Sequence, residues 1–184
     1  VYKKIVVAHN SLVKGEWLQF ALRPDSYEMY GKTLGLAGFG RIGREVAKRA
    51  GPFDVRILYY DKYIHVSPEE RKRLVVEEVS FEKLLTESDI VSLHVPLTSE
   101  TRAMMNRQTL KMMKNSAILI NTARGGLVDE GALYEALKDR IIAGAGLDVF
   151  EKEPPSSDNP LFKLDNVVLT PHISAGTKDA LIAK

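Results

Sequence analysis

From Lys32 onward, short apolar runs alternate with longer amphipathic stretches. The apolar runs lack a polar side chain at every second position, which is typical of strands that are buried on both faces of a sheet. We predict strands over residues 33–38, 55–60, 90–95, 117–121, 143–149 and 167–170. The stretches between them have helical spacing, and we predict helices over residues 41–50, 80–87, 106–112 and 129–138. This alternation predicts an α/β fold, in which helices cover both faces of a parallel sheet.

Residues 1–31 follow a different pattern. Residues 1–13 are consistent with the end of a helix, and the next 18 residues mix glycine, proline, charges and aromatic side chains without a period. The aromatic residues of this segment are Trp17, Phe20, Tyr27 and Tyr30. They could pack back on their own domain as a small satellite cluster, or they could form an arm that packs on another subunit. We predict a connecting helix and dimerisation arm over residues 1–31.

The composition excludes several classes of function. The 184 residues suffice for one domain with a core, and the net charge of +2 does not favour nucleic acid or an anionic membrane as a partner. No apolar run approaches the ~20 residues that span a bilayer, and the first ten residues lack the pattern of a signal peptide. Cysteine is absent, which removes disulfides, thiolate metal sites and a cysteine nucleophile. We predict no metal site and a cytoplasmic location.

A glycine-rich motif, G-x-G-x-x-G, lies between the first predicted strand and the first predicted helix. It consists of Gly38, Phe39, Gly40, Arg41, Ile42 and Gly43. In this context the first glycine permits a tight turn, the second lets the backbone approach a diphosphate, and the third lets helix and strand pack closely. The helix start offers free N–H groups to the diphosphate. We predict a Rossmann-type doubly wound sheet with three layers, over residues 32–184, that binds a dinucleotide.

Asp61 ends the second predicted strand, 18 residues after Gly43. An acidic residue at this strand tip accepts hydrogen bonds from the adenosine ribose hydroxyls. Because a carboxylate would repel a 2′-phosphate, we predict NAD rather than NADP as the cofactor. Lys62 and Arg56 are nearby positive charges that could soften this preference.

Three polar residues follow later strands, at the edge of the sheet where open parallel sheets bind ligands. Arg124 precedes two glycines, so the backbone can turn and present a guanidinium that matches a carboxylate. Glu153 and His172 follow the last two predicted strands. A carboxylate hydrogen-bonded to an imidazole fixes its orientation and favours its protonated form. His9 and His65 have no such context.

Five motifs together make the sequence resemble the cofactor domain of the D-isomer-specific 2-hydroxyacid dehydrogenases. They are GKTLGLAGFGRIG, DIVSLHVPLTSETRAMMN, ILINTARGGLVDEGAL, AGAGLDVFEKEPP and VVLTPHIS. The resemblance runs from about Gly31 to Thr177. The related formate dehydrogenase has a glutamine beside its histidine, whereas Glu153 stands at that position here, which favours a substrate whose carbonyl must be protonated.

The resemblance implies a role for each matching residue. Arg124 would bind the substrate carboxylate and carbonyl, His172 would be the general acid/base, Glu153 would pair with it, and Asp148 would hydrogen-bond the nicotinamide carboxamide. The residues that would contact the cofactor are Gly38, Gly40, Arg41, Ile42, Gly43, Asp61, His94, Val95, Pro96, Thr101, Thr122, Ala123, Arg124, Asp148, His172 and Ala175. His172 would protonate the carbonyl oxygen of a 2-oxo acid while a hydride is transferred from NADH to the 2-carbon.

In the family this domain is inserted in a smaller substrate domain, which is missing from the present sequence. We therefore expect a fragment, weakly active or inactive alone, and a substrate that the sequence does not identify. Two other functions remain open. One is a non-catalytic NAD-sensing module, because transcriptional corepressors share this fold and even the catalytic triad. The other is a role mainly in assembly, through residues 1–31 of a homodimer.

Overall fold

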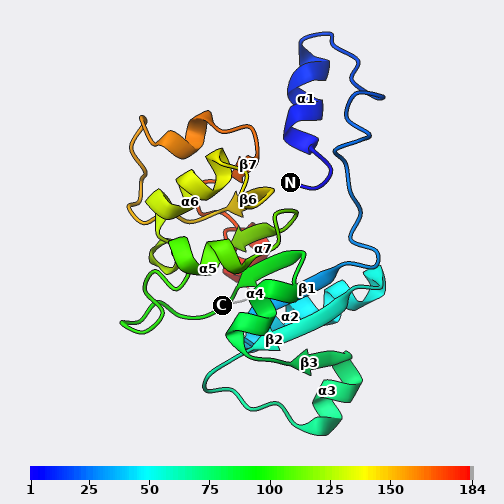
Figure 1. The fold of residues 1–184 in the computed structure, drawn as a ribbon, viewed down its shortest axis with the longest axis vertical. Helices are drawn as coiled ribbons and strands as arrows, with labels where there is room; N and C mark the ends of the chain where they lie inside the picture. The colour runs from blue at the N-terminus through cyan, green and yellow to red at the C-terminus, as the bar shows by residue number, and fades with distance from the viewer. Residues whose placement is uncertain (183–184) are drawn as a thin grey trace.

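The computed structural model describes residues 1–182, and it contains one seven-stranded sheet in which every pair of neighbours is parallel (Figure 1). The strands are β1 (Thr33–Ala37), β2 (Arg56–Tyr60), β3 (Val76–Glu78), β4 (Ile90–Leu93), β5 (Ile118–Asn121), β6 (Gly144–Leu147) and β7 (Val167–Leu169). Their order is β3-β2-β1-β4-β5-β6-β7. The predicted Rossmann-type fold is confirmed.

Helices connect successive strands. The α-helices are α1 (Ile5–Val13), α2 (Arg41–Ala50), α3 (Pro68–Leu74), α4 (Phe81–Glu87), α5 (Arg107–Met112), α6 (Glu130–Lys138) and α7 (Lys178–Ile182). Three short 3-10 turns complete the elements, namely η1 (Gly51–Phe53), η2 (Gly125–Leu127) and η3 (Pro160–Lys163). Among residues 1–182, no helix is long and apolar enough to cross a bilayer.

The strand order reverses at β1, because β2 pairs on one side of it and β4 on the other. At such a point the connections leave β1 and β4 toward opposite faces of the sheet, so that a crevice opens at the carboxyl ends of the strands. The loops after β1, β2, β4, β5, β6 and β7 all emerge at this edge. The fold therefore brings together polar residues that lie more than 100 positions apart in the sequence.

Two apolar clusters form the core. One contains Leu84, Leu93, Leu119 and Leu133, packed beneath α4, α5 and α6, and the other contains Leu36 and the side chains around α2. These leucines are almost fully shielded from solvent, and each contributes roughly 1.5–3 kcal/mol by burial. This packing explains why the predicted strands carry apolar side chains at successive positions.

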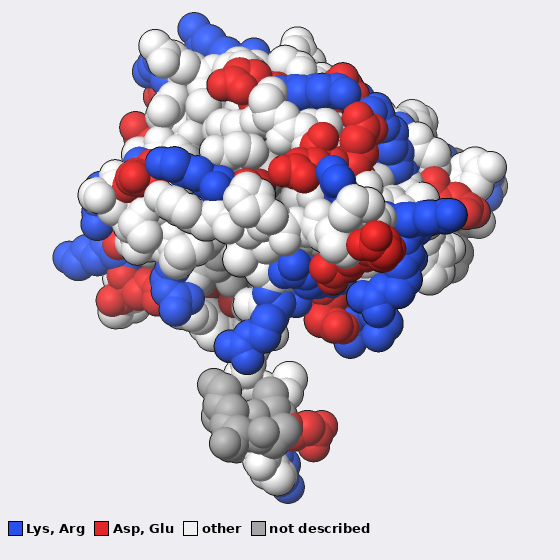
Figure 2. Space-filling view, turned by 90° about the horizontal axis from the view of Figure 1, so that it is seen from below, with Lys and Arg blue, Asp and Glu red and all other residues white. Residues whose placement is uncertain are grey.

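The structure adds two elements on the β3 edge that the sequence did not predict, α3 and β3. Helix α3 begins after the N-cap Ser67, with Pro68 at its first position, but its sequence is PEERKRL and no residue of it is buried. The edge strand β3 is three residues long and reads VEE. Neither has an apolar period, because each packs only at the rim of the sheet, where charges of both signs alternate on the surface (Figure 2).

The N-terminal segment stands at one side of the sheet and leaves most of its apolar side chains in solvent (Figure 1). Only Ser11 is buried in α1. Trp17 is 73% exposed, Phe20 is 69% exposed and Tyr30 is 71% exposed. Trp17, Phe20 and Tyr30 therefore do not join a satellite cluster, whereas Tyr27 packs against Tyr2 with ring centroids 5.9 Å apart. The first of the two alternatives for this segment thus holds for Tyr27 but not for the other three aromatic residues.

Candidate active site

The glycine loop after β1 is tightly packed, and the packing requires two of its glycines. Gly38 has a φ of 102°, and a Cβ added there would lie 2.6 Å from the carbonyl carbon of His94. A Cβ added at Gly43 would lie 2.3 Å from the carbonyl oxygen of Gly38. Any side chain at either position would push the loop away from the strand or from α2.

The start of α2 is open to a ligand. Gly40 is the N-cap, no side chain accepts a hydrogen bond there, and the first turn has no acidic residue. The first N–H groups of a helix are strong donors that attract anions, and here no side-chain cap occupies them. Arg41 and Ile42 are exposed beside them, and a Cβ at Gly40 would meet nothing within 4 Å. A dinucleotide diphosphate fits this cradle by charge and by space.

Asp61 follows β2 and holds the glycine loop. Its Oδ2 accepts a hydrogen bond from the Phe39 N–H at 2.8 Å, and its Oδ1 accepts from the N–H groups of Tyr63 and Ile64, each at 2.9 Å. A carboxylate has about four lone-pair sites, so three bonds leave capacity for a hydroxyl donor. Asp61 thus fixes its own side chain next to the loop, at the position expected for a ribose acceptor.

The residues after β4 form one wall of the crevice. The His94 N–H donates to the carbonyl oxygen of Ala37 at 2.7 Å, and its Nε2 lies 3.0 Å from the Ser92 hydroxyl oxygen. Burial lowers the pKa of His94 from 6.5 to about 4, so its ring is neutral at neutral pH. Val95 and Pro96 continue this wall. The Thr101 hydroxyl donates to the carbonyl oxygen of Pro96 at 2.6 Å and thereby closes the turn.

The loop after β5 presents Arg124 to solvent. The buried Asn121 supports the loop, because its Nδ2 donates to the Arg124 carbonyl oxygen at 2.9 Å and its Oδ1 accepts from the Ala123 N–H at 3.1 Å. The next residue, Gly125, touches the loop after β6, since a Cβ there would lie 1.8 Å from the carbonyl oxygen of Phe150. The Asn121 side chain and this backbone contact together set the position of the Arg124 backbone, and the Arg124 Nη1 donates to the carbonyl oxygen of Ala123 at 2.6 Å.

His172 and Glu153 form a direct pair. The Nδ1 of His172 lies 2.7 Å from Oε2 of Glu153, while the Phe150 N–H donates to Oε1 at 3.0 Å. The hydrogen bonds from His172 and Phe150 hold the pKa of the Glu153 carboxyl below its usual range, and the nearby Arg124 charge adds to the effect. The ionised carboxylate orients the ring through Nδ1, which leaves Nε2 available to a ligand.

Asp148 lies beneath this pair and is 3% exposed. Its Oδ1 accepts from the Thr170 hydroxyl at 2.5 Å and from the Ile173 N–H at 3.0 Å, and its Oδ2 accepts from the Ser174 N–H at 2.9 Å. Burial alone would raise its pKa, but these hydrogen bonds outweigh burial and hold the pKa of Asp148 far below the ordinary range. In the structure Asp148 therefore binds the His172 turn, in addition to any contact with a nicotinamide.

The sequence analysis did not predict this role of Thr170. The other candidate cofactor residues, Thr122, Ala123 and Ala175, lie on the loops after β5 and β7, where Thr122 and Ala175 are exposed. All the predicted residues thus lie on loops or helix starts at the carboxyl edge of the sheet. The arrangement could bind a dinucleotide and place an acid/base pair next to a guanidinium.

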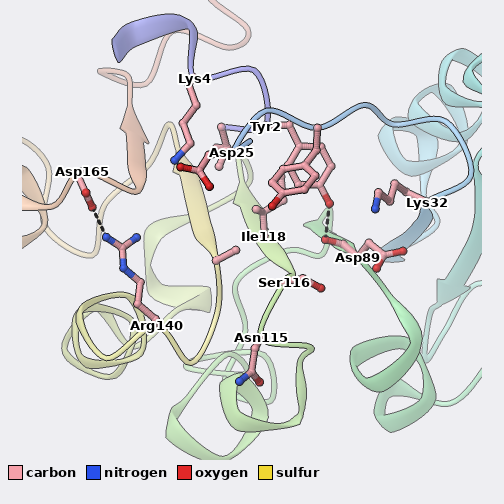
Figure 3. Close-up of a pocket in the computed structure, with 13 residues that line it drawn as sticks. Tyr2, Lys4, Asp25, Lys32, Asp89, Asn115, Ser116, Ile118, Arg140 and Asp165 are labelled. Atoms are coloured by element: carbon pink, nitrogen blue, oxygen red, sulfur yellow. Dashed lines mark hydrogen bonds and ion pairs between the residues drawn. The ribbon is translucent and has the colours of Figure 1, made fainter. Parts of the chain in front are cut away.

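A cavity of about 470 Å³ lies at the opposite, amino-terminal edge of the sheet (Figure 3). The Tyr2 hydroxyl donates to the carbonyl oxygen of Asp89 at 3.1 Å, and burial together with the Asp89 charge raises the pKa of Tyr2 to about 12. The Asp89 carboxylate in turn accepts from the Thr33 N–H at 2.8 Å. This seam joins the N-terminal segment to the sheet and is separate from the glycine loop.

Residues 1–174 match the model of the NAD-binding domain of the D-isomer-specific 2-hydroxyacid dehydrogenases. A glyoxylate reductase of Korarchaeum cryptofilum is 52% identical over 180 residues, which cover 96% of this chain and 53% of that protein. A D-3-phosphoglycerate dehydrogenase of Archaeoglobus fulgidus is 47% identical over 178 residues, which cover 97% of this chain and 33% of that protein. The chain thus spans about half the length of the first relative and a third of the second.

The fold also matches a solved structure. The crystal structure of D-lactate dehydrogenase with NAD+ from Lactobacillus jensenii superposes with a TM-score of 0.84 at 36% identity. The match covers 98% of this chain and 57% of that one. At this identity the similarity extends beyond the general arrangement of helices and strands.

Proposed function

Because the chain belongs to the D-isomer-specific 2-hydroxyacid dehydrogenase family and is its NAD-binding domain, we propose that the complete protein interconverts a D-2-hydroxy acid and a 2-oxo acid. The observation that carries the proposal is the 2.7 Å contact between His172 Nδ1 and Glu153 Oε2, at the same edge of the sheet as the glycine loop. An oriented acid/base pair beside a dinucleotide site is what reduction of a carbonyl requires.

The cofactor of this domain is NAD. We propose that the N–H groups at the start of α2 hold its diphosphate and that Asp61 receives the adenosine ribose hydroxyls. The repulsion of a 2′-phosphate by Asp61 favours NAD over NADP. Bound NAD supplies the hydride acceptor or donor, and the residues described here supply position, charge and a proton.

The chemical roles of the chain's own residues follow from their chemistry. The exposed Arg124 guanidinium can bind the substrate carboxylate bidentately. The Nε2 of His172 can donate a proton to the carbonyl oxygen during reduction and accept it during oxidation. Glu153 stabilises the imidazolium that this cycle needs. Asp148 keeps His172 in place from below, and it can also approach a nicotinamide amide.

We further propose a homodimer formed through residues 1–31, with residues 32–184 as the cofactor domain. The exposed aromatic side chains of the first segment support an interface, because such side chains are enriched in interfaces. The match to the family model begins at residue 1 of this chain, so it does not separate residues 1–31 from the cofactor domain. The cytoplasmic location expected from the sequence stays a prediction.

The proposal is tested by following NADH oxidation by the complete protein with a panel of 2-oxo acids. The panel includes glyoxylate, hydroxypyruvate, phosphohydroxypyruvate and longer 2-oxo acids, because the relatives named above differ in substrate. Turnover of one or more of them supports an enzyme. NADH binding without turnover of any 2-oxo acid would favour the NAD-sensing alternative.

A further inference from the structure

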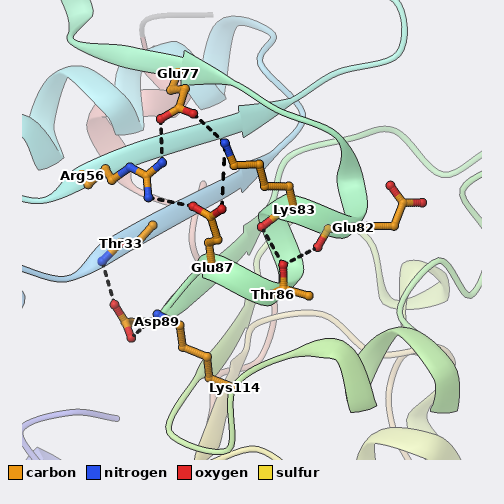
Figure 4. A network of polar contacts seen from close by, with 9 residues as sticks. All are labelled: Thr33, Arg56, Glu77, Glu82, Lys83, Thr86, Glu87, Asp89 and Lys114. Atoms are coloured by element: carbon orange, nitrogen blue, oxygen red, sulfur yellow. Dashed lines mark hydrogen bonds and ion pairs between the residues drawn. The ribbon is translucent and has the colours of Figure 1, made fainter.

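Arg56 and Lys62 are the two positive side chains near Asp61 in sequence that could attract the 2′-phosphate of NADP. The structure places Arg56 too far from the glycine loop to do so. Arg56 lies at the start of β2, at the edge of the sheet opposite the glycine loop. Its guanidinium is 2.7 Å from carboxylate oxygens of both Glu77 and Glu87 (Figure 4). Lys83 bridges the same two carboxylates. Arg56 therefore cannot contribute to the nucleotide site.

Lys62 lies at the correct edge, directly after Asp61. Its Nζ is 2.7 Å from Oε2 of Glu100, and the Tyr63 hydroxyl donates to the same oxygen at 2.6 Å. Glu100 belongs to the turn that follows β4. Because β2 and β4 flank β1, this contact joins the two loops on either side of the loop that carries Gly38.

A 2′-phosphate brings additional negative charge and strong acceptor oxygens, so an enzyme that accepts NADP needs donors beside the ribose. Lys62 and Tyr63 are the donors nearest to Asp61 in sequence, and both are bound to one carboxylate. We propose that Glu100 is a specificity-determining residue, which withholds Lys62 and Tyr63 from a 2′-phosphate and so favours NAD over NADP. This inference rests on the proposed function, since it assigns the selectivity of the same nucleotide site.

The size of the effect follows from the exposure of the pair. The Lys62 side chain is 56% exposed and that of Glu100 is 53% exposed. An exposed ion pair is screened by water and salt, so its release changes affinity by a modest factor rather than by orders of magnitude. We expect a change of about fivefold in the affinity for NADPH, and a larger one at low ionic strength.

The experiment uses fluorescence titrations of the complete protein with NADH and NADPH. Glu100→Gln removes the charge at nearly constant shape and should lower the Kd for NADPH about fivefold, while the Kd for NADH changes by less than about twofold. The double variant Glu100→Gln with Lys62→Met should lose this gain. Asp165→Asn is the matched control, because it removes one negative charge from an exposed pair with Arg140, at the amino-terminal edge of the sheet.

The outcomes separate this inference from the function on which it rests. An unchanged ratio of the two Kd values in Glu100→Gln would overturn the role of Glu100, as would a gain that persists in the double variant or that also occurs in Asp165→Asn. None of these outcomes bears on the proposed function, which is tested by turnover of 2-oxo acids. Wild-type protein that binds neither dinucleotide would overturn the proposed function together with this inference.

Discussion

The hydroxyl of Thr170 donates a hydrogen bond to the buried carboxylate of Asp148 at 2.5 Å, two residues before His172. The carbonyl oxygen of Asp148 also accepts the N–H of His172 at 2.8 Å. His172 has a φ of 54°, a left-handed conformation that costs a residue other than glycine roughly 1–2 kcal/mol. The contacts with Asp148 offset this cost and hold the ring next to Glu153.

Replacing Thr170 with valine removes the hydroxyl at nearly constant shape. We expect kcat of the complete enzyme to fall about tenfold, because the turn that carries His172 loosens, while the Kd for NADH changes little. Steady-state kinetics and the NMR resonances of the His172 ring measure the effect. Thr170→Ser keeps the donor and should restore both. Normal kcat and normal ring resonances in the valine variant would remove this role of Thr170.

Replacing His172 with asparagine removes the group that transfers the proton. We expect turnover of the complete enzyme to fall by about 10²–10⁴-fold, the usual contribution of a positioned acid/base. The affinity for NADH, measured by fluorescence titration, should stay within about twofold, because His172 lies away from the diphosphate cradle. Near-normal turnover would exclude His172 from the mechanism.

Replacing Glu153 with glutamine keeps the shape of the side chain but removes its charge. The His172 ring then loses the charged acceptor that fixes its orientation through Nδ1. We expect kcat for reduction of the 2-oxo acid to fall about tenfold, while the Kd for NADH changes little. Steady-state kinetics and fluorescence titration measure the two quantities. An unchanged kcat in the variant would show that the carboxylate does not position His172.

Replacing Asp61 with alanine should weaken NADH binding and relax the discrimination against NADPH. The structure adds a second effect, since the variant also loses the acceptor for the Phe39 N–H and frees the glycine loop. Asp61→Asn retains an acceptor for this N–H without the charge, so it separates loop support from charge repulsion. Titration with both dinucleotides gives the ratio of affinities, and an unaltered ratio in both variants would refute the assignment.

His94 should make the domain sensitive to acid. Its pKa falls from 6.5 to about 4 on folding, because burial disfavours the charged ring. Between these pH values the unfolded chain binds a proton that the folded chain does not, so acidification destabilises the fold. Allowing for partial exposure, His94 should account for on the order of 2 kcal/mol of the free energy of unfolding that is lost between pH 7 and pH 4.

Denaturant unfolding of the wild-type protein and of His94→Gln at both pH values measures this contribution. Glutamine carries no titratable proton, so the variant should lose less stability on acidification even if it starts from a lower value at pH 7. Equal losses in the two proteins would assign the acid sensitivity to other groups.

The sheet and the glycine loop could be predicted because their signals are local. A strand buried on both faces needs a continuous apolar run, and the loop needs glycines at fixed spacing, as Gly38 and Gly43 illustrate. The helix predicted over residues 80–87 also has a local signal, because the Ser80 hydroxyl accepts from the Lys83 N–H at 3.2 Å at the start of α4. In contrast, α3 and β3 carry almost no apolar side chains, so their tertiary position rather than their pattern specifies them.

The site was predictable only in part. Residues at strand ends were expected to meet because parallel strands share one edge, and His172 and Glu153 do so. Contacts that depend on loop conformation were not, and the pair of Lys62 with Glu100 spans 38 residues between two loops. Likewise, the resemblance to the family implied that Asp148 contacts the cofactor. Only the structure shows that three donors of the 170–174 turn bond to its carboxylate.

The contact between Gly125 and the Phe150 carbonyl leaves room for a hydrogen atom and nothing larger. The loop that bears Arg124 and the loop that bears Glu153 are therefore in direct backbone contact. Neither loop can shift without displacing the other, so the distance from Arg124 to the pair of His172 and Glu153 is constrained by the backbone. Substrate preference could then diverge among homologues through changes elsewhere, while this spacing stays constant.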